Sequence, residues 1–422
     1  MFEREKMKPI INNRIKNLSG IRNFALRIIN FFVPKKNNSY FFEPQPNTYI
    51  DKQDLINYSG DSVLTFLNYL KSVDFEYEIK VWLVIYFPER IPEYENWIGK
   101  DGRIVLHYVV SENCYSGIKR KVVLIKNLLR RFRCINFVCS TPFSEKRIYV
   151  RRQNLICLNY FSSFKSDFGT VDADLCPKNW KLICTNSMLD STIQSSAFYV
   201  PYDCFKPLGL PRNDILYSEY KRKPIIDWII RKISRIPERI IVYAPTFRDY
   251  ERDDETMKRN IWGYEDSGLI NDVLKQYDAI VIAKLHAWQN ISVIDEPSDN
   301  VILFEPNFEF SIYDLMVMAD LFISDYSSIG VDFLMTSKPI IYNLYDLDEY
   351  METRGMSFEP IDFLYAGSIS KSELELAESI RGVFEEEYDW DKYNRVKRML
   401  IKHHDGECCK RVFDYLREAE VF

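Results

Sequence analysis

The sequence predicts an α/β protein made of two parallel-sheet domains that face each other across a cleft. Its 422 residues suffice for two domains, at ~100–200 residues each. In both halves, short apolar runs alternate with helix-like stretches, a rhythm typical of parallel strands joined by helical crossovers. Hydrophobic residues make up 46% of the chain and aromatic residues 15%, so each half can bury a core of its own.

In the first half, apolar runs bounded by polar or turn residues are predicted to be buried strands. These strands are expected at 81–86, 104–110, 135–140, 154–159 and 180–186. A polar connector is expected near 36–60, before the first of them. Residues 121–133 are predicted to form a helix, because five apolar residues recur there at helical spacing.

The second half restarts the alternation after a break near 201–214 and a charged, helix-like stretch at 224–236. Strands are expected at 239–244, 279–284, 301–304, 321–324 and 339–344. Helices are expected at 269–277, 312–318, 329–336, 370–386 and 390–420. The predicted domains are an N-terminal one over 60–220 and a C-terminal one over 221–422, preceded by a separate segment over 1–36.

The net charge of −5 argues against a protein-wide nucleic-acid-binding surface. Residues 1–36 nevertheless hold nine Lys or Arg against two Glu, with apolar residues at helical spacing between them. This pattern predicts a basic amphipathic helix that lies in an anionic membrane surface or docks on the protein's own core. A second basic stretch, 119–152, predicts either a surface that meets phosphate-rich material or a solvated helix face. Nucleic acid is not an expected partner, because no binding module accompanies the charge.

The nine cysteines include no C-x-x-C pair, and several stand inside apolar runs. This favours buried, reduced thiols over a zinc site or a disulfide frame. We also expect no secretory signal, because the N-terminus has no continuous apolar stretch before a small-residue cleavage site. The sequence has no run of ~18 uncharged apolar residues, so it predicts no membrane span. The chain is therefore expected on the cytosolic side.

Polar clusters follow three predicted strands of the second half, at the sheet edge where ligands bind in such folds. The first reads S-D-Y-S-S-I-G-V-D and begins at the end of strand 321–324. Ser327 and Ser328 stand where a helix N-cap belongs, so the N–H groups of the first turn and the two hydroxyls are predicted to bind an anion. Asp332 is placed to reach a ribose hydroxyl. The alternative is an ordinary N-cap without a ligand.

The second cluster reads Y-A-P-T-F-R-D and the third K-L-H, each at the end of a predicted strand. Arg248 suits bidentate phosphate binding and Thr246 supplies a hydroxyl, unless Arg248 only pairs with Asp249. His286 is predicted to donate to a phosphoryl oxygen or to transfer a proton, unless it is structural. Together, these three clusters contain the groups that commonly bind phosphate: hydroxyls, an arginine, a histidine and a helix N-terminus.

Common nucleotide-binding fingerprints are missing. The sequence contains neither G-x-G-x-x-G nor G-x-x-x-x-G-K-[ST], which argues against a dinucleotide oxidoreductase and a P-loop NTPase, and G-x-S-x-G is also absent. The tripeptides at 172–174 and 346–348 both read D-x-D. Such short acidic patterns are expected by chance in an acid-rich chain, so no cofactor is expected; a divalent cation is the alternative.

With these motifs in place, the sequence resembles the CDP-glycerol:poly(glycerophosphate) glycerophosphotransferase family, the teichoic-acid and capsule polymerases and primases with a two-domain GT-B fold. Six segments carry the resemblance in the family's order: G-L-P-R-N-D at 209–214, Y-A-P-T-F-R-D at 243–249, K-L-H at 284–286, S-D-Y-S-S-I-G-V-D at 324–332, K-P-I-I-Y at 338–342 and Y-D-L-D-E-Y at 345–350. Several motifs in one order are far more specific than any single motif.

The resemblance implies a CDP-activated donor, CDP-glycerol or CDP-ribitol, held by the C-terminal domain. Carried onto this sequence, the residues that would bind CDP and its pyrophosphate are Thr246, Arg248, His286, Asp325, Ser327, Ser328 and Asp332. Of these, Arg248 and His286 would be catalytic. An acceptor hydroxyl would attack the distal phosphorus in line and CMP would leave. Family members act on polymer or lipid-linked acceptors at the inner membrane face, which implies a peripheral protein on the cytoplasmic side of the cell membrane.

The sequence departs from the family pattern on the acceptor side. The family carries W-H-G-T-P-x-K in its N-terminal domain, and its histidine is proposed to activate the acceptor. The corresponding stretch here, 159–165, reads N-Y-F-S-S-F-K, so Lys165 is retained and Tyr160 takes the place of the histidine. A phenol with a pKa of ~10 is a poor base at neutral pH. The base is therefore expected elsewhere, with Asp167 or the acceptor itself as candidates.

The sequence thus predicts a membrane-peripheral GT-B transferase that moves an alditol phosphate from a CDP donor to a cell-surface polymer precursor. Two alternatives stay open. One is a GT-B glycosyltransferase that uses a CMP- or UDP-sugar. The other, suggested by Tyr160, is a catalytically degenerate subunit that binds nucleotide or polymer.

Overall fold

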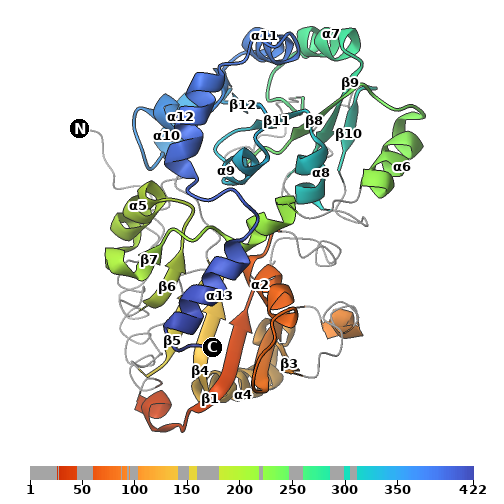
Figure 1. Ribbon diagram of the computed structural model, residues 1–422. Coiled ribbons are helices and arrows are strands. Elements are labelled where there is room, and N and C mark those ends of the chain that lie inside the picture. Colours follow the sequence, from red (N-terminus) through yellow and green to blue (C-terminus); the bar gives the residue numbers. More distant parts are fainter. Residues whose placement is uncertain are drawn as a thin grey trace.

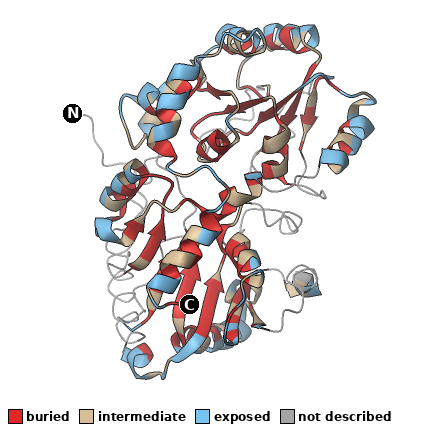
Figure 2. Ribbon diagram, in the orientation of Figure 1, coloured by how far each residue is buried: buried red, intermediate tan, exposed pale blue. Residues whose placement is uncertain are grey.

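A computed structural model of the chain shows two parallel sheets, each at the centre of its own layered domain (Figure 1). The structure describes residues 26, 28–44, 60–86, 88–92, 95, 103–140, 152–158, 180–217, 222–246, 260–285, 299–304 and 311–422. Buried residues gather in the strands and on the helix faces that cover them, so each sheet carries its own core (Figure 2). The predicted α/β architecture with two Rossmann-like domains is confirmed.

The N-terminal sheet has seven described strands in the order β3-β2-β1-β4-β5-β6-β7, and every described pairing in it is parallel. The strands are β1 (Lys36–Glu43), β2 (Ile79–Ile85), β3 (Ile104–Val110), β4 (Cys134–Cys139), β5 (Asn154–Cys157), β6 (Trp180–Cys184) and β7 (Phe205–Lys206). The helices described here include α2 (Ser62–Lys71), α4 (Gly117–Arg133) and α5 (Met188–Phe198). In Figure 1, β1 and β4 point with their carboxyl ends toward the other domain.

The expected polar connector near 36–60 is wrong for residues 36–43, which form the inner strand β1. Its first three residues are polar and exposed, whereas Tyr40, Phe41 and Phe42 are almost completely buried. The apolar run of three is too short to signal a strand by itself. Pairing with β2 on one side and β4 on the other supplies the missing stabilisation.

The C-terminal sheet has six described strands in the order β10-β9-β8-β11-β12-β13, again parallel in every described pair. The strands are β8 (Arg239–Tyr243), β9 (Ala279–Ala283), β10 (Val301–Leu303), β11 (Leu321–Ser324), β12 (Ile340–Asn343) and β13 (Ser368–Ser370). The helices are α6 (Arg222–Ile233), α7 (Gly268–Gln276), α8 (Ile312–Met318), α9 (Ile329–Phe333), α10 (Leu347–Thr353), α11 (Glu373–Phe384) and α12 (Trp390–Leu400).

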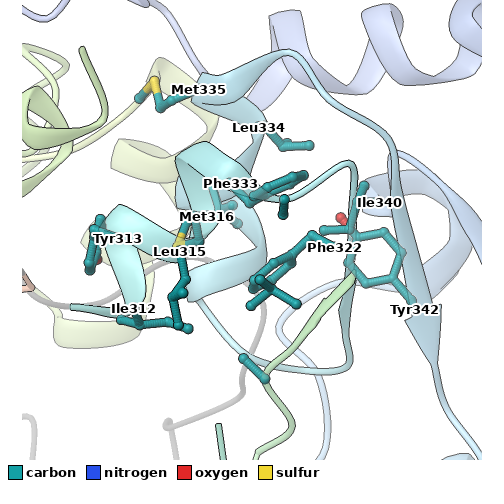
Figure 3. Close-up of a cluster of buried hydrophobic side chains, with 14 of the residues drawn as sticks. Ile312, Tyr313, Leu315, Met316, Phe322, Phe333, Leu334, Met335, Ile340 and Tyr342 are labelled. Carbon is teal, nitrogen blue, oxygen red and sulfur yellow. The ribbon is translucent and has the colours of Figure 1, made fainter. Parts of the chain in front are cut away.

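A buried cluster fixes α8 and α9 on one face of the C-terminal sheet (Figure 3). Phe322 of β11 stacks on Phe333 of α9, with 4.5 Å between the ring centroids. Leu315 and Met316 of α8 and Ile340 of β12 pack in the same cluster. The cluster therefore places the short helix α9 directly beside the end of β11.

The chain returns to the N-terminal domain at its C-terminal end. The predicted helix over 390–420 is two helices, α12 and α13 (Cys408–Glu418), separated by a turn in which Gly406 has a left-handed φ of 73°. α13 packs in the N-terminal core, and Phe422 stacks on Tyr40 at 4.8 Å. The N-terminal sheet thus includes β1, which precedes residue 60, and its core includes the last helix of the chain.

No helix among the described residues is long and apolar enough to cross a membrane. Most of the predicted amphipathic segment 1–36 lies outside the described residues. Its last turn is described and is attached to the N-terminal domain. There, the amide of Asn30 donates to Gln153 at 2.7 Å and Asn30 is fully buried, while Phe31 and Phe32 are exposed.

Candidate functional site: a carboxylate-anchored turn at the domain boundary

The centre of the candidate site is Asp325, the first residue after β11. One of its carboxylate oxygens accepts the backbone N–H of Thr246, and the other accepts the Thr246 hydroxyl, both at 2.7 Å. The backbone N–H of Ser327 donates to the second oxygen at 3.0 Å. Asp325 is 1% exposed, and both loops start at the ends of neighbouring strands, β8 and β11. A single buried carboxylate therefore joins the second polar cluster to the first.

Ser327 and Ser328 form the turn that leads into α9, and both are half-buried. The N–H groups of Gly330 and Val331 donate to the carbonyls of Ser327 and Ser328, each at 3.1 Å. Ser328 is the N-cap residue of α9, at the predicted position, and its side chain makes no cap hydrogen bond to the helix. Gly330 packs closely on Ser324, because a Cβ placed there would lie 3.3 Å from the Ser324 hydroxyl. The small residue lets the turn approach the end of the strand.

Asp332 was expected to reach a ribose hydroxyl, but both of its oxygens have partners inside the protein. They accept Nε and Nη2 of Arg212 at 3.0 and 3.3 Å, and Oδ2 also accepts the Tyr313 hydroxyl at 2.9 Å. Arg212 and Asp332 are each 2% exposed at the side chain. A ribose contact by Asp332 stays a prediction, and the structure gives this carboxylate a role in joining the two domains.

Four predicted site residues lie outside the described residues: Arg248, His286, Tyr160 and Lys165. The chain toward the first two is described as far as Thr246 and Leu285. Thr246 follows β8 and Leu285 follows β9, and these two strands are adjacent. At their ends, the N–H of Lys284 donates to the Tyr243 carbonyl at 2.8 Å. The three predicted clusters therefore start from three neighbouring strands, β9, β8 and β11, as the sequence indicated.

An aromatic group beside this edge escaped the sequence analysis. Asn343, the last residue of β12, accepts the Tyr264 hydroxyl at 2.6 Å and donates to the Trp262 carbonyl at 2.9 Å. Trp262 stacks on Tyr243 with a centroid distance of 4.8 Å. Nothing in the sequence indicates that the 260–264 turn folds back onto the sheet, since the contacts join residues about 80 positions apart in the chain.

The two D-x-D tripeptides show no metal-ligand geometry in the described part of the chain. Asp346 is buried and accepts the Tyr326 hydroxyl at 3.1 Å, whereas Asp348 is exposed on α10. Residues 172–174 lie outside the described residues. Among the described residues, no group of three or more His, Cys, Asp or Glu side chains is arranged to hold a metal ion.

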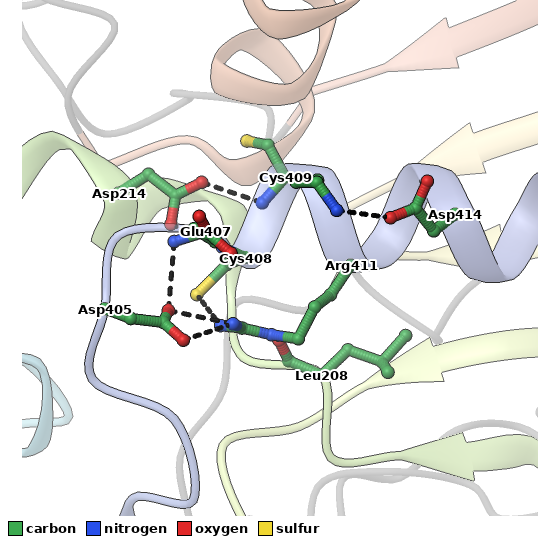
Figure 4. A network of polar contacts seen from close by, with 9 residues as sticks. Leu208, Asp214, Asp405, Glu407, Cys408, Cys409, Arg411 and Asp414 are labelled. Atoms are coloured by element: carbon green, nitrogen blue, oxygen red, sulfur yellow. Dashed lines mark hydrogen bonds and ion pairs between the residues drawn. The ribbon is translucent and has the colours of Figure 1, made fainter.

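The linker after β7 is a 3-10 segment, η8 (Pro211–Tyr217), and it contains part of the G-L-P-R-N-D motif. The carboxylate of Asp214 accepts the backbone N–H groups of Cys408 and Cys409, both at 2.7 Å (Figure 4). It thereby caps α13, the helix by which the chain returns to the first domain. Burial raises the pKa of both thiols, which fits the prediction of buried, reduced cysteines at these two positions.

Two facing Rossmann-like domains, with polar loops after adjacent strands of the second, define a GT-B-like class of protein. The wall teichoic acid polymerase TagF has a similar fold: one solved structure matches with a TM-score of 0.66 over 96% of both chains, at 17% identity. The UDP-GlcNAc 2-epimerase from Neisseria meningitidis, bound to UDP-GlcNAc, matches with a TM-score of 0.55 over 90% of this chain and 99% of the epimerase, at 12% identity.

The sequence model of the CDP-Glycerol:Poly(glycerophosphate) glycerophosphotransferase family matches residues 165–418. The chain belongs to this family, whose members include teichoic acid glycerol- and ribitol-phosphate transferases. The ribitol-phosphate primase of Bacillus spizizenii is 26% identical over 56% of this chain and 61% of its own length. The glycerol-phosphate primase of Bacillus subtilis is 28% identical over 50% of each chain. The match to these relatives therefore spans less than two thirds of their length.

Proposed function

We propose that this chain transfers glycerol phosphate or a related alditol phosphate from a CDP-activated donor to a cell-surface polymer or lipid-linked acceptor, with release of CMP. Family membership supports the transferase reaction. The names of the relatives cover both glycerol and ribitol phosphate, so they support an alditol without selecting one. One solved TagF structure comes from a CDPG soak, which supports a cytidine diphosphate donor for that protein and, by proposal, for this one.

One observation carries the proposal: Asp325 holds Thr246 and the Ser327 backbone in one buried hydrogen-bonded group. The Asp325 carboxylate accepts these hydrogen bonds from donors of the protein itself. The half-buried hydroxyls of Ser327 and Ser328 lie beside it. Arg248 follows Thr246 by two residues in the sequence and would bring a guanidinium to the same edge. An edge with hydroxyl and guanidinium donors suits a pyrophosphate, which needs several donors and positive charge.

The proposed reaction is an in-line displacement at the distal phosphorus of the donor. Arg248 and His286 would neutralise the charge that develops on the phosphoryl oxygens, and the Ser327–Ser328 turn would hold the pyrophosphate in place. The acceptor oxygen forms the new phosphorus–oxygen bond as the bond to the CMP oxygen breaks. The proton of the acceptor hydroxyl passes to a general base. Tyr160 is poorly suited to act as this base, because the pKa of an ordinary phenol is ~10.

The first alternative is a glycosyltransferase that uses a CMP- or UDP-sugar, and the structural likeness to a UDP-GlcNAc epimerase keeps it open at the level of the fold. The second is a degenerate binding subunit, suggested by Tyr160. An assay of nucleotide release with CDP-glycerol, CDP-ribitol and sugar nucleotides, which detects both CMP and UDP and uses membrane extract as acceptor, separates the three. A phosphodiester product with CMP release supports the proposal, a glycosidic product with CMP or UDP release supports the first alternative, and binding without release of either nucleotide supports the second.

We also propose that the protein works at an anionic membrane surface. Four apolar side chains of α4 form a single exposed stripe: Ile118, Val122, Ile125 and Leu129. Exposed bases flank this stripe: Lys119, Lys121, Lys126 and Arg133. An apolar stripe bordered by lysine and arginine suits acyl chains on one side and lipid phosphates on the other. The exposed Phe31 and Phe32 lie on the turn attached to the same domain.

A further inference from the structure

The G-L-P-R-N-D segment connects three parts of the molecule through three successive side chains. Arg212 pairs with Asp332 in the C-terminal domain. The amide of Asn213 donates to Asn186, just beyond β6 of the N-terminal domain, at 3.4 Å. Asp214 caps α13, on the returning chain (Figure 4). The chain passes between the domains at this linker and again where it returns to α13. The motif holds these two segments together.

The Arg212–Asp332 pair is the contact of this motif that reaches the candidate site. Nε and Nη2 of the guanidinium meet the two carboxylate oxygens, and the Tyr313 hydroxyl donates to one of them. A guanidinium offers a rigid fork that matches a carboxylate, so the pair fixes direction as well as distance. Both side chains are 2% exposed, so water does not compete for these bonds.

The helix that carries Asp332 needs such anchors. α9 is only five residues long, and so short a helix has no stability of its own in water. Asp325 joins the start of the preceding turn to Thr246, in the loop after β8 of the C-terminal domain. Asp332 holds the far end of the same segment to the linker. The turn with Ser327 and Ser328 lies between these two buried carboxylates.

We propose that Arg212 is a positioning residue for the donor-binding turn and that it acts through Asp332. This inference rests on the proposed function, because it assigns the turn to the CDP donor. The pair makes the orientation of Ser327 and Ser328 depend on the linker between the domains. An arrangement of the two domains that loosens the pair also loosens the turn, so donor affinity is coupled to domain orientation.

The first test measures amide hydrogen exchange of the full chain without ligand. Arg212→Lys keeps the charge and loses the fork, and Asp332→Asn keeps the shape and loses the charge. We expect exchange about tenfold faster in 324–336 for both variants, with β8 and β9 unchanged. Tyr313→Phe keeps the ion pair and replaces the other two variants if they fold poorly. We expect it to give a smaller increase in the exchange rate of residues 324–336. Arg235→Lys is the matched control, since Arg235 pairs with Asp278 on the surface of the C-terminal domain, which also contains Asp332.

The second test compares the Michaelis constants for donor and acceptor, with CDP-glycerol and CDP-ribitol as donors. Positioning predicts that Arg212→Lys raises the donor KM about tenfold while the acceptor KM stays constant. The double variant should be no worse than either single variant, because both remove one interaction. Unchanged exchange in 324–336, exchange that rises equally everywhere, or a lower kcat at constant donor KM would overturn the inference. A wild-type protein without turnover refutes the proposed function, and the exchange measurement still decides the role of Arg212.

Discussion

The backbone N–H and the hydroxyl of Thr246 both donate to Asp325, one to each carboxylate oxygen and both at 2.7 Å. These bonds join the loops that follow β8 and β11, 79 positions apart in the chain. Both residues therefore already have a protein partner, and their contacts to a nucleotide stay predictions. Their joint effect is to hold the strand ends and the Ser327 turn in a fixed relation.

The Asp325 anchor should be essential. Asp325→Asn replaces one acceptor oxygen with an NH₂ group that faces protein donors, so we expect a stability loss of about 1–3 kcal/mol and CMP release at least about tenfold slower. Thermal unfolding and the CMP-release assay measure the two effects. Asp320→Asn is the matched control, because Asp320 accepts the Ile240 N–H at the opposite end of the same strands. Equal losses of CMP release in both variants would contradict a specific role of Asp325.

Arg248 and His286 are predicted to act in the reaction itself. We expect Arg248→Ala and His286→Ala to abolish CMP release, because each removes a donor that offsets phosphoryl charge in the transition state. Circular dichroism should show both variants folded. A wild-type rate in either variant would remove that residue from the proposed site.

Membrane attachment should depend on α4. Ile118→Glu combined with Ile125→Glu places two charges in the exposed apolar stripe, so binding to anionic vesicles should fall about tenfold or more in a sedimentation assay. Leu269→Glu on α7 is the control, since Leu269 is an exposed apolar residue of the other domain. Deletion of 1–25 tests the amphipathic segment separately and spares the buried Asn30. Vesicle binding that survives both changes would refute the proposed surface.

The C-terminal helix should stabilise the N-terminal domain. Phe413 of α13 is 8% exposed and contacts the rings of Phe75 and Phe422. Phe413→Ala should cost about 3–5 kcal/mol, because it removes a buried ring and leaves a cavity. Hydrogen exchange should then increase in β1 and α2 rather than in β8 and β11. Faster exchange confined to the C-terminal domain would contradict this assignment.

Strongly apolar elements were predictable almost to the residue. The sequence predicted strands at 104–110 and 321–324 and a helix at 312–318, and the structure has β3, β11 and α8 over those same residues. Periodicity and run length suffice for such segments, because their apolar residues follow one another at the spacing typical of the element. β1 was missed because the positions of its neighbours, and not its composition, make residues 36–43 a strand.

For the site, the sequence determined which chemical groups exist and that three clusters follow buried strands of the same half of the chain. Their partners were decided by tertiary structure: Asp332 meets Arg212 from 120 positions away, and Asp325 meets Thr246 from 79. A carboxylate beside a strand end has the same sequence signature whether it faces a ligand or a buried guanidinium. Local pattern records spacing along one segment, whereas the partner of a buried charge depends on how distant segments pack. That packing gives Asp325 and Asp332 protein partners on either side of the turn between them, while their contacts to a nucleotide stay predictions.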